Sequence, residues 1–148
     1  MLATMSECAL CQTPGGEILW QDEVCRLVLV GGDEGRDFPG FCRVIWRTHV
    51  AEMSDLATNE RRHLMNVVFA AEFAVRELMQ PDKINLASLG NVVPHLHWHV
   101  IPRWRDDSRY PAPVWIPMQR AGAVPPAPTF SALATAFSRA LAEIQAES

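Results

Sequence analysis

One stretch of this sequence carries a histidine at every second position: His95-Leu96-His97-Trp98-His99-Val100-Ile101. Side chains alternate between the two faces of a β-strand, so in a strand the three imidazoles project from one face. The apolar residues between them project from the other face, whereas in a helix the rings would be turned by about 200° from one histidine to the next. The flanking valines and isoleucine favour a strand. We therefore predict a strand over residues 96–103 that packs one face on a core and lines a cleft with its histidines.

Hydrophobic periodicity predicts the other regular elements. Short or alternating apolar runs predict four more strands, over residues 17–21, 25–30, 41–47 and 83–89. An apolar stripe at helical spacing predicts a long helix over residues 59–80, with Thr58 or Asn59 as its N-cap, and a second stripe predicts a helix over 131–146.

The remaining segments are predicted to be irregular. Residues 1–16 form a short lead, residues 31–40 a glycine-rich loop, and residues 104–128 a proline-rich segment. Neighbouring strands with one long helix between them favour an α+β fold: an antiparallel, about five-stranded sheet with the long helix packed on it and a C-terminal helix. Because no linker divides the chain, we expect a single domain over 1–148, with 104–148 as a C-terminal extension.

Composition narrows the class of protein. The chain has 148 residues, is 49% hydrophobic and 20% charged, and has a net charge of −4. Without a dense basic run it is not expected to bind nucleic acid. Without about 20 consecutive apolar residues or a signal-peptide layout it is expected to be cytoplasmic and not to enter a membrane. In that reducing compartment the four cysteines are thiols or metal ligands, and Cys25 and Cys42, inside apolar runs, are predicted core residues.

A row of imidazoles supplies nucleophiles, phosphate-oxygen donors and proton carriers near neutral pH. Two other interpretations stay open on spacing alone. The three histidines can be surface residues of a solvated sheet, or they can be ligands of a catalytic zinc, which would make the protein a metalloenzyme.

The histidine stretch resembles the signature of the histidine-triad (HIT) family, in which three histidines alternate with apolar residues. The lead-in Gly90-Asn91-Val92-Val93-Pro94, the Pro39-Gly40 turn, His49 and the long helix follow in the family's order. The resemblance covers roughly residues 8–103. It implies a HIT-like fold, a homodimer, and a nucleotidyl hydrolase or transferase that acts at the α-phosphate of a nucleotide without an organic cofactor.

The resemblance also implies roles for individual residues. His97 is the nucleophile that forms a covalent nucleotidyl intermediate, and His99 holds phosphate oxygens and assists the leaving group. The backbone carbonyl of His95 orients the His97 ring. Substrates of the family are of the dinucleoside polyphosphate or nucleoside phosphoramidate type.

Four positions match substrate contacts of the family: Asn91, Asn85, Asp33 and Val92. The two asparagines correspond to amides near the phosphates, Val92 offers its backbone N–H, and Asp33, with Asp37 close behind, is the expected ribose-binding acid. Taken without the resemblance, Asn91 reads as a turn residue and Asn85 as a polar group at a strand end.

Two positions depart from the family's pattern. Phe41 replaces a histidine that often supports the nucleophile, and Val92 replaces a serine or threonine that often binds phosphate. These departures motivate an alternative in which the protein binds nucleotides with weak or no catalysis.

A structural zinc site is expected at Cys8, Cys11, His49 and His95. A tetrahedral zinc needs two ligands besides the C-x-x-C pair, and branches of the family that bind zinc place the two histidines at these positions. The alternative is two reduced cysteines and a His49 that merely packs. His63 is predicted to lie on the helix surface. Trp115, with Arg103-Trp104-Arg105, either covers apolar surface or makes a dimer contact, the interpretation we favour, or lines the cleft.

Overall fold

Five antiparallel strands form one sheet in the order β1-β2-β3-β5-β4 in the computed structural model, which describes residues 4–147. The strands are β1 (Glu17–Gln21), β2 (Cys25–Leu29), β3 (Cys42–Trp46), β4 (Lys83–Ala87) and β5 (His97–Arg103). This confirms the predicted α+β fold with a five-stranded antiparallel sheet. Four of the predicted strands extend one or two residues beyond the observed ends.

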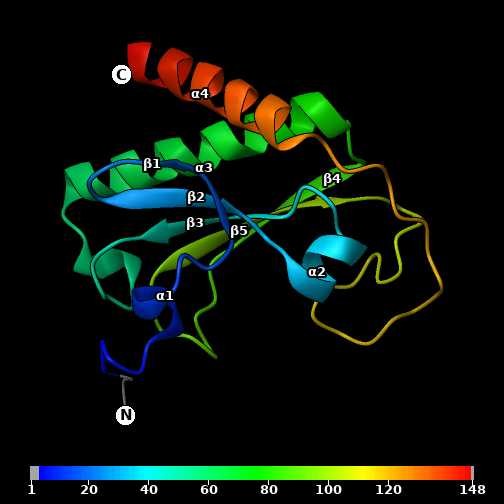
Figure 1. Cartoon of the computed structure of the whole chain (residues 1–148), viewed down its shortest axis with the longest axis horizontal. Helices are drawn as coiled ribbons and strands as arrows, with labels where there is room; N and C mark the ends of the chain where they lie inside the picture. Colours follow the sequence, from blue (N-terminus) through cyan, green and yellow to red (C-terminus); the bar gives the residue numbers. More distant parts are fainter. Residues whose placement is uncertain (1–3, 148) are drawn as a thin grey trace.

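Two long helices, α3 (Thr58–Met79) and α4 (Phe130–Ala146), lie side by side over one face of the sheet (Figure 1). Helix α3 packs on β2, β3 and β5, and α4 packs on α3 and β1. The α3 N-cap is Ala57, so the prediction of Thr58 or Asn59 was wrong: the Glu60 carboxylate accepts the Ala57 N–H at 2.7 Å and closes the first turn. No helix within residues 4–147 is both long and apolar enough to cross a membrane.

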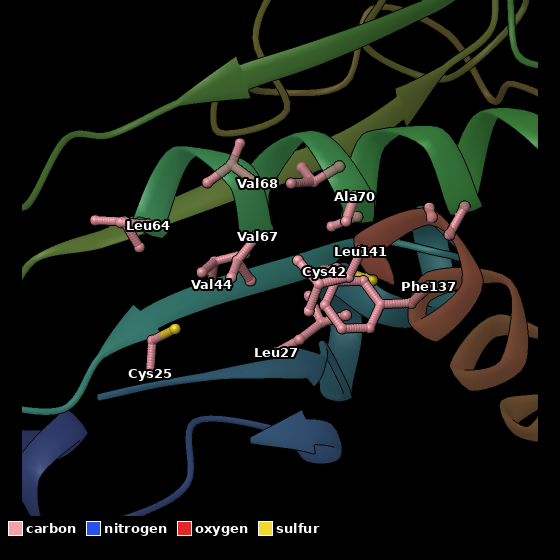
Figure 2. Packing of buried hydrophobic residues seen from close by; sticks show 14 of the residues in the cluster. Cys25, Leu27, Cys42, Val44, Leu64, Val67, Val68, Ala70, Phe137 and Leu141 are labelled. Atoms are coloured by element: carbon pink, nitrogen blue, oxygen red, sulfur yellow. The ribbon is translucent and has the colours of Figure 1, made fainter. Parts of the chain in front are cut away.

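The main core lies between the sheet and these helices (Figure 2). Leu27 and Val44 are contributed by the strands, and Phe137 by α4. The side chain of Phe137 is fully buried in this core. Cys25 and Cys42 are buried here as predicted, and burial raises the pKa of the Cys42 thiol to about 12, which leaves it an unreactive apolar group.

The opposite face of the sheet carries two smaller apolar clusters and the histidines. Leu96 and Val100 belong to the main core, whereas His97 and His99 project to the other face, as the alternation predicts. On this face a short helix α1 (Ala9–Gln12) covers Val28 and Ile45. The predicted N-terminal lead therefore contains a turn of helix, and a 3-10 turn, η1 (Met53–Asp55), precedes α3.

The predicted loop over 31–40 contains a short helix, α2 (Gly32–Asp37), so that prediction was wrong. Gly32 begins it with φ +64°, a conformation that favours glycine. A Cβ on Gly35 would lie 2.0 Å from the Val30 carbonyl oxygen, so only glycine allows this close approach. Acidic residues in the first turn and Arg36 in the last suit the helix dipole, and the glycine content hid these signals.

Residues 104–128 contain no helix or strand, as predicted, and a buried ion pair anchors them. Arg103, at the end of β5, donates from Nε and Nη2 to the two oxygens of Asp107 at 2.9 and 3.1 Å, and both side chains are 2% exposed. The same carboxylate accepts the backbone N–H groups of Trp104, Arg109 and Tyr110. Burial opposes ionisation of Asp107, but these donors outweigh it and lower its pKa.

Replacing Asp107 with asparagine is expected to destabilise the protein by about 3–5 kcal/mol at neutral pH, because Arg103 is left buried without its anion. An unfolded aspartate has a pKa of about 3.9, so the contribution of the pair is complete above that value and is lost as pH falls through the lowered pKa of the folded state. Urea unfolding of both proteins at several pH values tests this. Asp106→Asn, at the exposed neighbouring residue, is the matched control. A stability difference that stays constant down to pH 3 would contradict the ionised pair.

Candidate active site and metal cluster

A cavity of about 470 Å³ opens on the histidine face of the sheet. Its walls come from β3, β5, α1, α2, the loop between β4 and β5, and the 104–128 segment. The lining residues are Leu10, Glu34, Arg43, Leu89, Gly90, Asn91, Val92, Val93, His97, His99 and Trp115.

His97, 8% exposed, has one ring nitrogen engaged by the backbone. Its Nδ1 lies 2.5 Å from the carbonyl oxygen of His95, and because a carbonyl only accepts, Nδ1 carries the proton. This is the orientation expected from the family resemblance, and it leaves the lone pair on Nε2. Burial lowers the pKa of His97, the hydrogen bond to His95 opposes this, and the charge of Arg43 lowers it further. The imidazole is therefore neutral, as a nucleophile must be.

His99, 5% exposed, is surrounded by aromatic rings. Its ring lies edge-on to His97 and to Trp115, with centroids 4.9 Å away in each case, and 5.7 Å from the centroid of Phe41. Burial, His97 and Arg43 lower the pKa of His99 to about 3. Phe41 thus packs on His99 with its own ring fully buried and gives no polar support to His97.

Arg43 and Glu34 belong to this site and were missed in the sequence. Arg43 lies directly opposite His99 in the β3–β5 ladder, and its Nη2 lies 3.2 Å from Glu34 Oε1. A charged residue inside the apolar run 41–46 was the available signal for Arg43, since strand alternation places it on the histidine face. Trp115 also lines the cavity and contacts His99, so the favoured interpretation that it only covers apolar surface was wrong.

The predicted substrate-binding residues divide into two groups. Asn91 and Val92 line the cavity, and Val92 is 93% exposed. Asn85 lies outside it, where its Oδ1 accepts from Arg103 Nη1 at 2.8 Å. Asp33 also lies outside the lining: its side chain is 87% exposed and pairs with Arg36. The geometry brings neither Asn85 nor Asp33 to the triad.

The four predicted zinc ligands lie together near the start of β5. Sγ of Cys8 lies 3.4 Å from His95 Nδ1, and Sγ of Cys11 lies 3.4 Å from both His49 Nδ1 and His95 Nδ1. The two Nδ1 atoms are 3.2 Å apart. A tetrahedral zinc with sulfur ligands at about 2.3 Å and nitrogen ligands at about 2.0 Å separates its ligand atoms by roughly 3.3–3.8 Å, so this set can hold the ion.

Two further features suit a cation at this cluster. His95 Nε2–H donates to the Trp46 carbonyl oxygen at 2.6 Å, which leaves the Nδ1 lone pair directed to the cluster, the arrangement usual for metal-bound histidines. Burial and the adjacent Cys8 raise the pKa of the Cys11 thiol, and a bound cation would favour its deprotonated form. Arg26 of β2 holds α1 in place by donating to Leu10 and Pro14 carbonyls at 2.8 Å.

His63 is not the surface residue predicted. Its Nε2 lies 2.7 Å from Asp22 Oδ2, and Asp22 Oδ1 accepts the N–H groups of Val24 and Cys25. This contact joins the turn between β1 and β2 to helix α3. The pairing partner lies 41 residues away, beyond the reach of helix periodicity.

Comparison with known proteins identifies the family of this chain. The model of the HIT domain matches residues 19–106, more than half of the chain, which confirms the family resemblance. An AP-4-A phosphorylase of Mycobacterium tuberculosis is 30% identical over 78 residues, 49% of this chain but only 40% of that protein. An uncharacterized HIT-like protein of Saccharolobus solfataricus is 30% identical over 47% of this chain and 53% of its own length. The chain thus aligns with about half or less of each relative.

Two solved structures share the fold. A histidine triad protein from Marinobacter aquaeolei has a TM-score of 0.66 and 25% identity, over 88% of this chain and 92% of its own. A zinc-bound histidine triad family protein from Mycobacterium smegmatis has a TM-score of 0.55 and 20% identity, over 98% of this chain and 100% of its own.

Proposed function

The chain belongs to the HIT domain family, and we propose that it is a nucleotidyl hydrolase or transferase acting at the α-phosphate of a nucleotide through a covalent nucleotidyl-His97 intermediate. The observation that carries this proposal is the hydrogen bond from His97 Nδ1–H to the His95 carbonyl. It selects one tautomer of a neutral, buried imidazole and leaves Nε2 as the nucleophilic atom beside the cavity.

The reaction has two displacements. The Nε2 lone pair of His97 attacks the α-phosphorus, and the bond to the leaving group breaks, with the leaving group taking the electron pair and a proton from solvent. Water or another acceptor then attacks the same phosphorus, the phosphorus–nitrogen bond breaks, and His97 is restored while the acceptor gives its proton to solvent. His99 and the amide of Asn91, both lining the cavity, hold phosphate oxygens during the transfer.

The substrate class proposed is a dinucleoside polyphosphate or a nucleoside phosphoramidate. The relative named as an AP-4-A phosphorylase supports the first of these. Trp115 supplies an aromatic ring at the cavity wall on which a base can stack. Asp33 and Asn85 stay predictions from the family pattern, which this geometry does not support.

Two alternatives are weaker. A protein that binds nucleotides without catalysis is favoured by Phe41, whose buried ring offers His97 no polar support. A metalloenzyme with the triad as ligands conflicts with the geometry, because His95 directs Nδ1 to the cysteines and His97 Nδ1 is bonded to the backbone.

We propose that a structural zinc is held by Cys8, Cys11, His49 and His95. The ion would crosslink α1 to the start of β5 and supply no chemistry to the nucleotide.

We also propose a homodimer. Phe69 and Phe73, four residues apart on α3, are 42% and 60% exposed, and β4 is an edge strand with Leu86 36% exposed. A second copy would cover the helix face and complete the hydrogen bonds of the edge.

Incubation with an adenylate donor is expected to add AMP to His97, detected by mass spectrometry of peptides prepared without acid. His97→Gln should abolish the adduct, and His63→Gln, outside the cavity, should retain it. Nucleotide binding without an adduct or product from any of several donors would favour the binding protein instead.

Metal analysis of the purified protein is expected to find about one zinc per chain, and much less in Cys8→Ser. Cys42→Ala, at a buried cysteine outside the cluster, should keep its zinc. Equal, substoichiometric zinc in wild type and Cys8→Ser would contradict the site.

Light scattering coupled to gel filtration is expected to give the mass of a dimer. Phe73→Lys should shift it toward the monomer, while Val124→Lys, at a similarly exposed residue (58%) in the 104–128 segment, should not. A monomeric wild type at micromolar concentration would overturn the proposed dimer.

A further inference from the structure

We propose that Arg43 is the phosphate-binding cation of the cavity and that Glu34 is its internal counterion until an anionic ligand takes its place. The inference rests on the proposed function and extends it, since it names the charged part of the substrate that the site recognises.

The position of Arg43 directs its charge to the reacting centre. Residues directly opposite in an antiparallel ladder have Cβ atoms about 5 Å apart on the same face, and Arg43 is opposite His99. Its neighbour Ile45 is opposite His97. Among the residues that line the cavity, all within the described part of the chain, Arg43 is the only arginine or lysine.

The guanidinium is held in place but incompletely bonded. It lies 5.6 Å from the centroid of the Phe41 ring, which gives it an aromatic support. Its contact with Glu34 is through a single pair of atoms at 3.2 Å, and its contact with the Gly15 carbonyl is long, at 3.5 Å. This is not the two-bond, fork-to-fork geometry that arginine makes with a carboxylate it binds permanently.

Unpaired polar atoms gather at this one place. Within residues 4–147, the buried side-chain nitrogen and oxygen atoms without a hydrogen-bond partner are Arg43 Nε, Glu34 Oε2 and His99 Nδ1. All three residues line the cavity. Buried polar groups are almost always paired, so this grouping marks a position where a ligand completes the bonding. A phosphate group suits it, because its oxygens accept from a guanidinium.

The charge balance of the site points the same way. Phosphoryl transfer places negative charge on the oxygens around phosphorus, and enzymes offset that charge with positioned cations. Burial lowers the pKa of His97 and His99, so neither ring carries a formal positive charge to offset the phosphate. Arg43 therefore supplies the positive charge of the site. Glu34 keeps the cation neutralised in the free protein, and a phosphate can displace its single contact.

The test measures binding of adenosine, AMP and inorganic pyrophosphate by calorimetry to wild type, Arg43→Gln, Arg43→Lys and Glu34→Gln. Arg43→Gln is expected to weaken AMP binding roughly 10- to 100-fold, the loss typical of a charge-assisted hydrogen bond, and to leave adenosine binding within about twofold. Arg43→Lys should recover part of the loss, and Glu34→Gln should bind AMP more tightly. Arg76→Gln, which removes a charge from the exposed surface of α3, should change nothing.

The outcomes separate the two proposals. AMP binding that does not depend on Arg43 overturns the phosphate-binding role and leaves the proposed function standing. Pyrophosphate binding that depends on Arg43, without binding of adenosine or AMP, supports that role and overturns the proposed function. Wild type that binds none of the three overturns both. If circular dichroism shows that Arg43→Gln is unfolded, the Arg43→Lys and Glu34→Gln variants decide. AMP affinity that is unchanged in both variants overturns the phosphate-binding role.

Discussion

The imidazole of His95 donates from Nε2 to the carbonyl oxygen of Trp46, and this contact at 2.6 Å determines much of the site. It fixes the ring so that Nδ1 meets Cys8 and Cys11, and it holds the end of β3 to the residue just before β5. The carbonyl of the same residue accepts from His97. The first histidine of the triad therefore lies between the cysteine–histidine cluster and the candidate nucleophile. His95 is thus the one residue that contacts both the two cysteines and the ring of His97 through these bonds.

The two faces of the sheet have different roles. One face packs on α3 and α4 and contributes the main apolar core. The other face collects the neutral histidines, Arg43 and Glu34, groups that the core would not tolerate unpaired. On the histidine face three buried polar atoms, Glu34 Oε2, Arg43 Nε and His99 Nδ1, have no hydrogen-bond partner within residues 4–147. They lie where a phosphate is proposed to bind. The Arg103–Asp107 pair completes the arrangement by holding the irregular segment that presents Trp115 to His99.

Much of the fold could be predicted because it depends on short-range patterns. Alternation identified the strand of His97, and helical spacing identified α3 and α4, because each pattern reports one buried face. The cysteine and histidine cluster came from the family pattern rather than from local spacing, since its members are scattered from residue 8 to residue 95. Helix α2 was missed because glycines that permit its close packing also look like loop residues. Arg43 and Glu34 were missed, and lining of the cleft by Trp115 was the less favoured alternative, because only the tertiary fold brings β3, α2 and the 104–128 segment to one cavity.

The stereochemical course at phosphorus tests the central claim, transfer through His97, more directly than any rate. A nucleotide substrate with a chiral α-phosphorothioate would be hydrolysed in isotopically labelled water and the configuration of the product determined. Each in-line displacement inverts phosphorus, so a nucleotidyl-His97 intermediate predicts net retention. Net inversion would mean a single direct displacement by water and would contradict the account.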